Sequence, residues 1–220
     1  MVLTMMLTEQ RADRVVLYNI DWQQFENILM DLGQTRSARI AYDNGALEIM
    51  SPLSEHEYYK ENIGTAIQDI AEVLERDYES LGSTTWRKQA KMAGLEPDNC
   101  FYFQNESKIR GKLDYDLNYD PPPDLALEID ITSKLIDRFP IYGRLGIPEL
   151  WCYDEGKLKI YLLQADETYQ ESPFSLVFPD LPVQEIPEVI NQYRLEGRRK
   201  IRQEIRKWAN SNTQNRVLEI

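Results

Sequence analysis

Residues 121–134 constrain the fold more strongly than any other stretch of this chain. Their three leading prolines exclude helix, because proline lacks an amide donor and has a fixed φ. From Asp124 onward apolar residues alternate with acidic or small ones, and a period of two predicts a β-strand. One face of that strand carries Leu125, Leu127, Ile129 and Ile131, and the other carries Asp124, Ala126, Glu128 and Asp130.

The acidic face of this strand needs something to neutralise it. Side chains two residues apart on a strand lie on the same side, about 7 Å from each other. Glu128 and Asp130 therefore repel each other unless a cation lies near both, and a divalent metal is the obvious cation for clustered carboxylates. In the alternative, the strand is half exposed and water solvates both charges. The small Ala126 and the polar residues 132–134 favour a site, because they leave room and offer polar partners.

Charge and composition limit the partners of the chain. The 220 residues carry a formal net charge of −12, which argues against broad, charge-driven affinity for nucleic acid. The single histidine, His56, excludes a zinc site built from several histidines. Cys100 and Cys152 each lie in an apolar, aromatic run, so we expect buried free thiols in a cytoplasmic protein. No stretch has the length and apolarity of a membrane span.

The first 50 residues contain a helix signal and a hairpin signal. Asp21 followed by Gln24 predicts a capping box at the start of a helix that ends at Gly33. Asn44-Gly45 between two alternating runs predicts a hairpin over residues 39–50.

The middle of the chain predicts a long helix and two strands. Ser54 and Glu57 form the pattern of a capping box, with Ser54 as the N-cap. The helix that follows carries an apolar stripe of Ile63, Ile67, Ile70 and Leu74. A strand over residues 83–89, a turn over residues 94–98 and an aromatic strand over residues 99–103 come next.

The second half of the chain repeats this alternation. Residues 104–123 read as a surface loop, and a short helix over residues 137–145 follows the acidic strand. A second hairpin over residues 149–163 precedes an irregular stretch over residues 165–184. From about Pro187 the chain is expected to be helical, with a frayed polar tail from Asn210.

This order of elements predicts an α/β fold, in which helices flank a mixed β-sheet core. We divide the chain into an N-terminal extension over residues 1–20, an α/β domain over residues 21–184, and a C-terminal basic amphipathic helix and tail over residues 185–220.

Asp98 is a second acidic residue at the start of a strand. If its strand and the acidic strand are neighbours, Asp98 and Glu128 converge on one ion. Two carboxylates with waters and a substrate phosphate are the usual ligands of Mg²⁺. Such an ion polarises a phosphodiester and lowers the pKa of bound water.

Four motifs resemble the Uma-type putative restriction endonuclease family, which belongs to the PD-(D/E)xK nuclease superfamily. They are residues 44–52 with His56, residues 96–98, residues 122–133 and residues 142–151, within a resemblance that extends from about residue 21 to residue 182. The resemblance implies a restriction-endonuclease-like core that hydrolyses phosphodiester bonds in DNA with Mg²⁺, or with Mn²⁺ in its place. It gives Asp98 the role of the first aspartate and Glu128 that of the acidic residue in the second motif.

The chain departs from the superfamily pattern at Asp130, where a lysine is expected to orient the attacking water. Lys134 or Arg138 could reach back into the site, Lys88 could enter from the preceding strand, or Asp130 could itself bind metal. We prefer Lys134, because it closely follows the acidic strand. In the alternative, Lys134 is a solvated surface charge.

The same resemblance is the main reason to consider Glu48 and His56. Glu48 faces away from its apolar neighbours on a predicted strand, and a histidine such as His56 titrates in the range of a general base. A structural role is at least as well supported for both.

Residues 194–208 are the one clearly basic stretch. They could contact phosphates. The spacing of Ile201, Ile205 and Trp208 also suits an amphipathic helix that docks on its own domain or forms a homodimer, and we favour docking or dimerisation.

Three functions remain in competition. The leading hypothesis is a Mg²⁺-dependent endonuclease with Asp98 and Glu128 as metal ligands. Its main rival is a catalytically weak or inactive nuclease-fold protein with a binding or regulatory role, which Asp130 and the acidic surface favour. A metal-dependent hydrolase of a small phosphorylated substrate suits the net charge, but the sequence has no phosphate-binding glycine loop.

Overall fold

The computed structural model describes residues 13–33, 38–129 and 134–217. Its strands are β1 (Arg14–Leu17), β2 (Arg39–Asp43), β3 (Ala46–Met50), β4 (Glu79–Ser80), β5 (Trp86–Lys88), β6 (Ala93–Leu95), β7 (Asn99–Tyr102), β8 (Leu125–Ile129), β9 (Glu149–Asp154), β10 (Lys157–Leu163) and β11 (Tyr169–Ser172). Its α-helices are α1 (Trp22–Leu32), α2 (Ser54–Val73), α3 (Glu106–Ile109), α4 (Phe139–Leu145), α5 (Ile186–Gln192) and α6 (Arg198–Val217).

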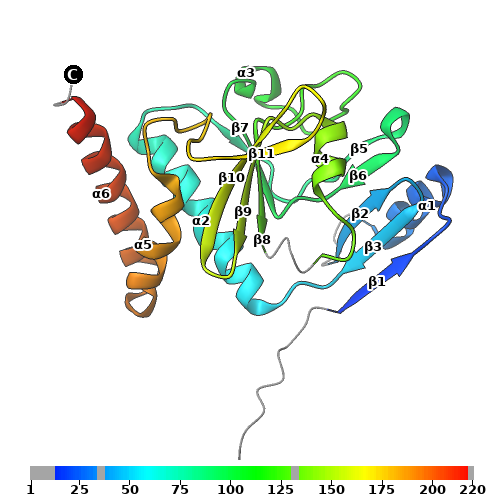
Figure 1. The fold of residues 1–220 in the computed structure, drawn as a ribbon, viewed down its shortest axis with the longest axis horizontal. Coiled ribbons are helices and arrows are strands. Elements are labelled where there is room, and N and C mark those ends of the chain that lie inside the picture. Colours follow the sequence, from blue (N-terminus) through cyan, green and yellow to red (C-terminus); the bar gives the residue numbers. More distant parts are fainter. Residues whose placement is uncertain (1–12, 34–37, 130–133, 218–220) are drawn as a thin grey trace, which may run out of the picture.

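The described strands form two sheets (Figure 1). The first has the order β1-β3-β2-β6-β5 and is antiparallel throughout. The second has the order β11-β10-β9-β8-β7-β4, and in it β8 and β9 run parallel. A parallel pair needs a crossover connection, and here the crossover contains α4. The predicted α/β class with a mixed sheet and a C-terminal helix is confirmed, although the strands divide into two sheets.

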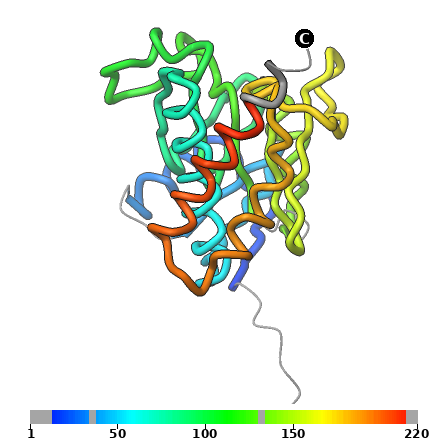
Figure 2. The backbone as a smooth tube through the Cα atoms, turned by 90° about the vertical axis from the view of Figure 1, so that its left-hand side faces the viewer, coloured from blue at the N-terminus to red at the C-terminus, as the bar shows by residue number. Residues whose placement is uncertain are grey.

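Helices cover the second sheet on the side away from the first sheet. Helix α2 contacts β8, and α5 and α6 pack against α2 and against each other. Figure 2, which looks onto this side, shows α5 and α6 in front of the remaining elements. The apolar core on this side includes Ile63, Ile67 and Ile70 of α2 with Leu125, Leu127 and Ile129 of β8.

A second core fills the space between the sheets and includes Ala126 of β8, Leu95 of β6 and Ile141 of α4. Strand β8 is therefore buried on both faces, and its faces divide as the alternation predicts. The half-exposed alternative is wrong, because β8 lies between β7 and β9 with core on either side.

Several predicted signals have the expected geometry. Asp21 and Gln24 form the predicted capping box of α1. The β2–β3 turn places Asn44 and Gly45 at positive φ, as its Asn-Gly sequence requires. Pro140 lies in the first turn of α4, and Gly146 ends this helix in the left-handed conformation.

The predicted capping box of the long helix is wrong. Helix α2 begins at Ser54 itself, and Leu53, which has no hydrogen-bonding side chain, occupies the N-cap. The Glu57 side chain does not cap the helix, because it pairs with Lys60 at 3.0 Å and lies 3.5 Å from His56.

Other boundaries also differ from the sequence expectation. The predicted turn over residues 94–98 begins in β6, because Gly94 pairs with Tyr42 of β2. Strand β1, from the predicted N-terminal extension, pairs with β3. The loop over residues 104–123 contains α3, and the irregular stretch over residues 165–184 contains β11.

The C-terminal helical region is two helices, because the chain turns at Gly197, whose φ is 87°. Helix α6 then continues past Asn210 to Val217, so a tail frayed from residue 210 is also wrong. Its Ile201, Ile205 and Ala209 are buried in the core formed with α2. The apolar face of the helix is therefore used within the chain, and a homodimer through this helix stays a prediction.

Candidate active site

Asp98 lies directly before β7 and forms hydrogen bonds with the neighbouring strand β8. Its amide donates to the carbonyl of Leu127 at 3.1 Å, and its Oδ2 accepts the amide hydrogen of Ile129 at 2.8 Å. The same oxygen lies 3.0 Å from Nε2 of His56. These contacts hold the buried Asp98 carboxylate against β8, which carries Glu128. Strands β7 and β8 are therefore neighbours, which is the condition set above for the two carboxylates to converge.

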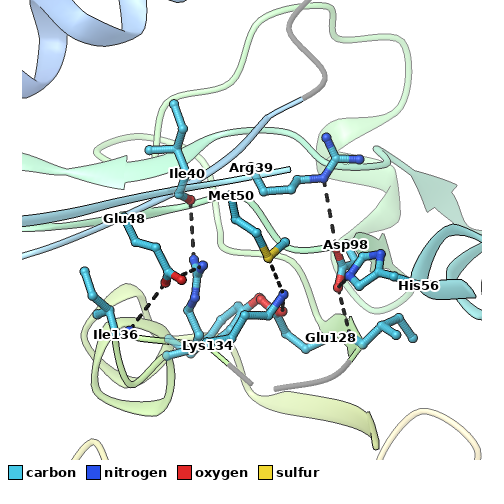
Figure 3. A network of polar contacts seen from close by, with 12 residues as sticks. Arg39, Ile40, Glu48, Met50, His56, Asp98, Glu128, Lys134 and Ile136 are labelled. Carbon is cyan, nitrogen blue, oxygen red and sulfur yellow. Dashed lines mark hydrogen bonds and ion pairs between the residues drawn. The ribbon is translucent and has the colours of Figure 1, made fainter. Parts of the chain in front are cut away.

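Glu128 is buried on β8 and contacts two side chains that follow the strand. The Tyr142 hydroxyl on α4 donates to its Oε1, and Nζ of Lys134 lies 3.7 Å from its Oε2. Figure 3 shows Lys134 pointing toward Glu128 and toward the sulfur of Met50. The Lys134 side chain is only 3% exposed, so the alternative of a solvated surface charge is wrong.

The two carboxylates differ in their affinity for a proton. Burial alone would raise the pKa of Asp98, but Lys134, His56 and the Ile129 amide outweigh burial and hold that pKa well below its usual value. Burial raises the pKa of Glu128, and the nearby Asp98 charge raises it further, against the opposing effect of Lys134. Neighbouring acids whose pKa values are shifted in opposite directions are typical of functional sites.

The carboxylate oxygens fit a metal held by two acidic ligands. Among the described residues, Oδ1 of Asp98 has only a 4.0 Å contact with Nε of Arg39, and Oε2 of Glu128 has only the contact with Lys134. One carboxylate oxygen of each acid is thus available to bind a metal ion. Within the described part of the chain no three histidine, cysteine or acidic side chains form a metal-binding group. Waters and a substrate phosphate commonly complete a Mg²⁺ site that has two carboxylates.

His56 lies in the first turn of α2 between two carboxylates. Its Nε2 faces Asp98, and its Nδ1 lies 3.5 Å from Oε1 of Glu57. The imidazole is nearly buried. This position suits a residue that orients Asp98.

Glu48 contacts a different set of residues. Its carboxylate accepts from Nη2 of Arg138 at 3.1 Å and from the amides of Leu135 and Ile136, and it lies 3.6 Å from Arg14. Glu48 is fully buried. These contacts join β3 to the segment between Lys134 and α4, as expected for a structural residue.

The other residues proposed to replace the expected lysine have different surroundings. Lys88 ends β5, an edge strand of the first sheet. Arg138 bonds Glu48 and influences Glu128 only through its charge. Asp130 lies outside the described residues.

Two side chains at the site were missed by the sequence reasoning. The Tyr142 hydroxyl donates a hydrogen bond to Glu128. Tyr142 follows Arg138, a residue already considered for the site, by four residues, and this spacing could have indicated that it lies on the same side of the predicted helix. Arg39 reaches Asp98 from β2, and nothing in the local sequence indicates this contact, because the two residues meet only through the packing of the sheets.

Fold and site together define an α/β protein with a buried pair of carboxylates, flanked by a lysine and a histidine. The chain belongs to the Uma2 family, described as "Putative restriction endonuclease", whose model matches residues 22–196. No curated protein matches the chain.

Among solved structures, the chain is similar to a "putative nuclease belonging to DUF820 from Anabaena variabilis ATCC 29413". The identity is 15% and the TM-score 0.47, over 82% of this chain and 96% of that one. In the described residues no helix is both long and apolar enough to cross a membrane.

Proposed function

We propose that the protein is a metal-dependent endonuclease that hydrolyses phosphodiester bonds in DNA. Asp98 and Glu128 would hold Mg²⁺ or Mn²⁺ through the oxygens that lack short hydrogen bonds. The observation that carries the proposal is the burial of the Lys134 side chain beside Glu128. Its ammonium group supplies the positive charge that the superfamily motif expects from a lysine at position 130, where this chain has Asp130.

Each side chain has a role in this proposal. A bound metal ion would polarise the phosphate and lower the pKa of the attacking water. Lys134 would orient that water and neutralise charge on the phosphate as the bond to the leaving oxygen breaks. Tyr142 fixes Glu128 through its hydroxyl, and His56 fixes Asp98. Such residues behind metal ligands orient them and tune their basicity.

The test is nicking of supercoiled plasmid with Mg²⁺, Mn²⁺ or EDTA. Asp98→Asn and Glu128→Gln preserve shape and remove charge, so both should abolish metal-stimulated cleavage while circular dichroism shows a folded chain. The exposed Asp31 and Glu188 offer matched controls, and Asp31→Asn and Glu188→Gln should cleave like the wild type. Full activity in both site variants would refute the assignment.

The non-catalytic rival predicts a different result. Titration calorimetry would then detect Mn²⁺ binding that depends on Asp98 and Glu128, but the wild type would leave the plasmid intact under all metal conditions. Metal binding and metal-stimulated nicking together would exclude this rival.

A further inference from the structure

Arg39 is a largely buried arginine whose contacts are unusually long. Its Nε lies 4.0 Å from Oδ1 of Asp98, and its Nη2 lies 3.8 Å from Oε1 of Glu57. The side chain is 12% exposed, and within the described residues Nε has no hydrogen-bond partner. An arginine kept for a structural ion pair normally makes short, often bidentate bonds. The guanidinium of Arg39 therefore retains donors for another group.

Arg39 also lies at the wall of a cleft. Figure 3 shows the Nε of Arg39 toward Asp98 and the terminal nitrogens pointing away from it. The cleft has a volume of about 760 Å³, and its other walls come from the end of α1, residues 81–85 and residues 113–115. This volume is within the range of small-molecule sites. The cleft and the carboxylate pair thus share Arg39.

The lining of the cleft suits a nucleotide base better than a run of phosphates. It contains the hydroxyl residues Ser83 and Thr84, the side chain of Tyr115 and three carboxylates, those of Glu26, Glu96 and Asp114. Its second arginine, Arg87, is paired with Glu26 at 2.9 Å. Carboxylates accept hydrogen bonds from base amino groups but repel phosphate, and aromatic rings stack on unpaired bases. The net charge of −12 likewise disfavours a long track of phosphate contacts.

We propose that this cleft binds the base of an unpaired nucleotide next to the cleaved bond, while Arg39 binds an oxygen of the adjoining phosphate. The preferred substrate is then single-stranded or locally unpaired DNA. This inference rests on the proposed nuclease function for the identity of the ligand, but binding can be measured without cleavage.

The test is fluorescence anisotropy with a labelled single strand of about 12 nucleotides, within the site sizes of single-strand binders. Calcium replaces magnesium, so that binding is measured without turnover. Ser83→Trp places a large side chain in the cleft, and Ser107→Trp places the same side chain on the exposed surface of α3. Loss of a stacked base should weaken binding about tenfold or more in Ser83→Trp, with no change in Ser107→Trp.

The contribution of Arg39 to binding of the strand is measured in the same assay. Arg39→Ala should weaken binding about tenfold, as for a charged hydrogen bond, and Arg39→Lys should restore part of it. A duplex of the same sequence should bind more weakly than the single strand.

Either of two outcomes would overturn the proposal. One is wild-type affinity in a folded Ser83→Trp protein, and the other is no measurable binding of the single strand by the wild type. Failure of the nuclease function alone has a separate signature, which is intact binding without cleavage in any metal.

Discussion

The ammonium group of Lys134 lies 3.7 Å from Oε2 of Glu128, although the lysine follows the end of the strand that carries the glutamate. Both side chains are almost fully buried, so their interaction is screened less than a surface pair. A lysine from the following segment can therefore place its charge beside the acidic strand without occupying position 130.

Lys134→Met should lower metal-stimulated cleavage by about 10²–10³-fold, the usual cost of losing one donor that stabilises developing charge. Lys134→Arg should retain part of the activity. The measurement is single-turnover cleavage, with Lys108→Met on the exposed surface of α3 as the matched control. Wild-type cleavage by Lys134→Met would remove the lysine from the mechanism.

His56→Phe should reduce cleavage or Mn²⁺ affinity by about 10–100-fold, as expected for a residue that orients a metal ligand. The reason is the loss of the 3.0 Å contact with Oδ2 of Asp98. His56→Gln, which keeps a donor in this region, should recover more activity than His56→Phe. Equal activity of both variants and the wild type would show that Asp98 needs no support from His56.

Glu48→Ala should lower the free energy of unfolding by about 3–5 kcal/mol, because it leaves the buried Arg138 without its carboxylate partner. Urea denaturation measures this change. Glu48→Gln keeps one acceptor oxygen, either for the Leu135 amide or for the Ile136 amide and Arg138, and should cost less. A Glu48→Ala protein that is as stable as the wild type but inactive would instead give Glu48 a catalytic role.

The native thiols should react slowly with Ellman's reagent. Burial raises the pKa of Cys100 from 9.0 to about 12 and also raises that of Cys152, so few thiolates form near pH 8. Because the folded state holds the Cys100 proton more tightly, this contribution to stability is present below about pH 9 and is lost as the pH rises toward 12.

The check on this account is the difference between native and unfolded protein. In guanidinium both thiols should react at once, and Cys100→Ala should reduce the fall in stability between about pH 9 and 11. Fast reaction of the native chain would mean that the thiols are accessible.

Local patterns predicted the elements at the centre of the site. The alternation from Asp124 to Ile129 gave the correct faces of β8, because a strand period of two fixes which side chains share a side. The proximity of Asp98 and Glu128 was predicted only on the condition that their strands are neighbours, and β7 does pair with β8. The buried free cysteines were also predicted correctly from their apolar neighbours.

Contacts between distant elements could not be predicted in this way. The division into two sheets depends on the pairing of β2 with β6, which are far apart in the sequence. Arg39 reaches Asp98 only because these sheets pack together. Glu57 has the spacing of a capping residue, but competition from Lys60 and His56 directs its carboxylate elsewhere.

The most direct measurement is anomalous diffraction from crystals soaked in Mn²⁺. Our account predicts one strong peak bound by Oδ1 of Asp98 and Oε2 of Glu128, with Lys134 beside it, and no such peak in Glu128→Gln crystals. Density at another place, or none between the two acids at saturating Mn²⁺, would contradict the shared ion on which the proposed function depends.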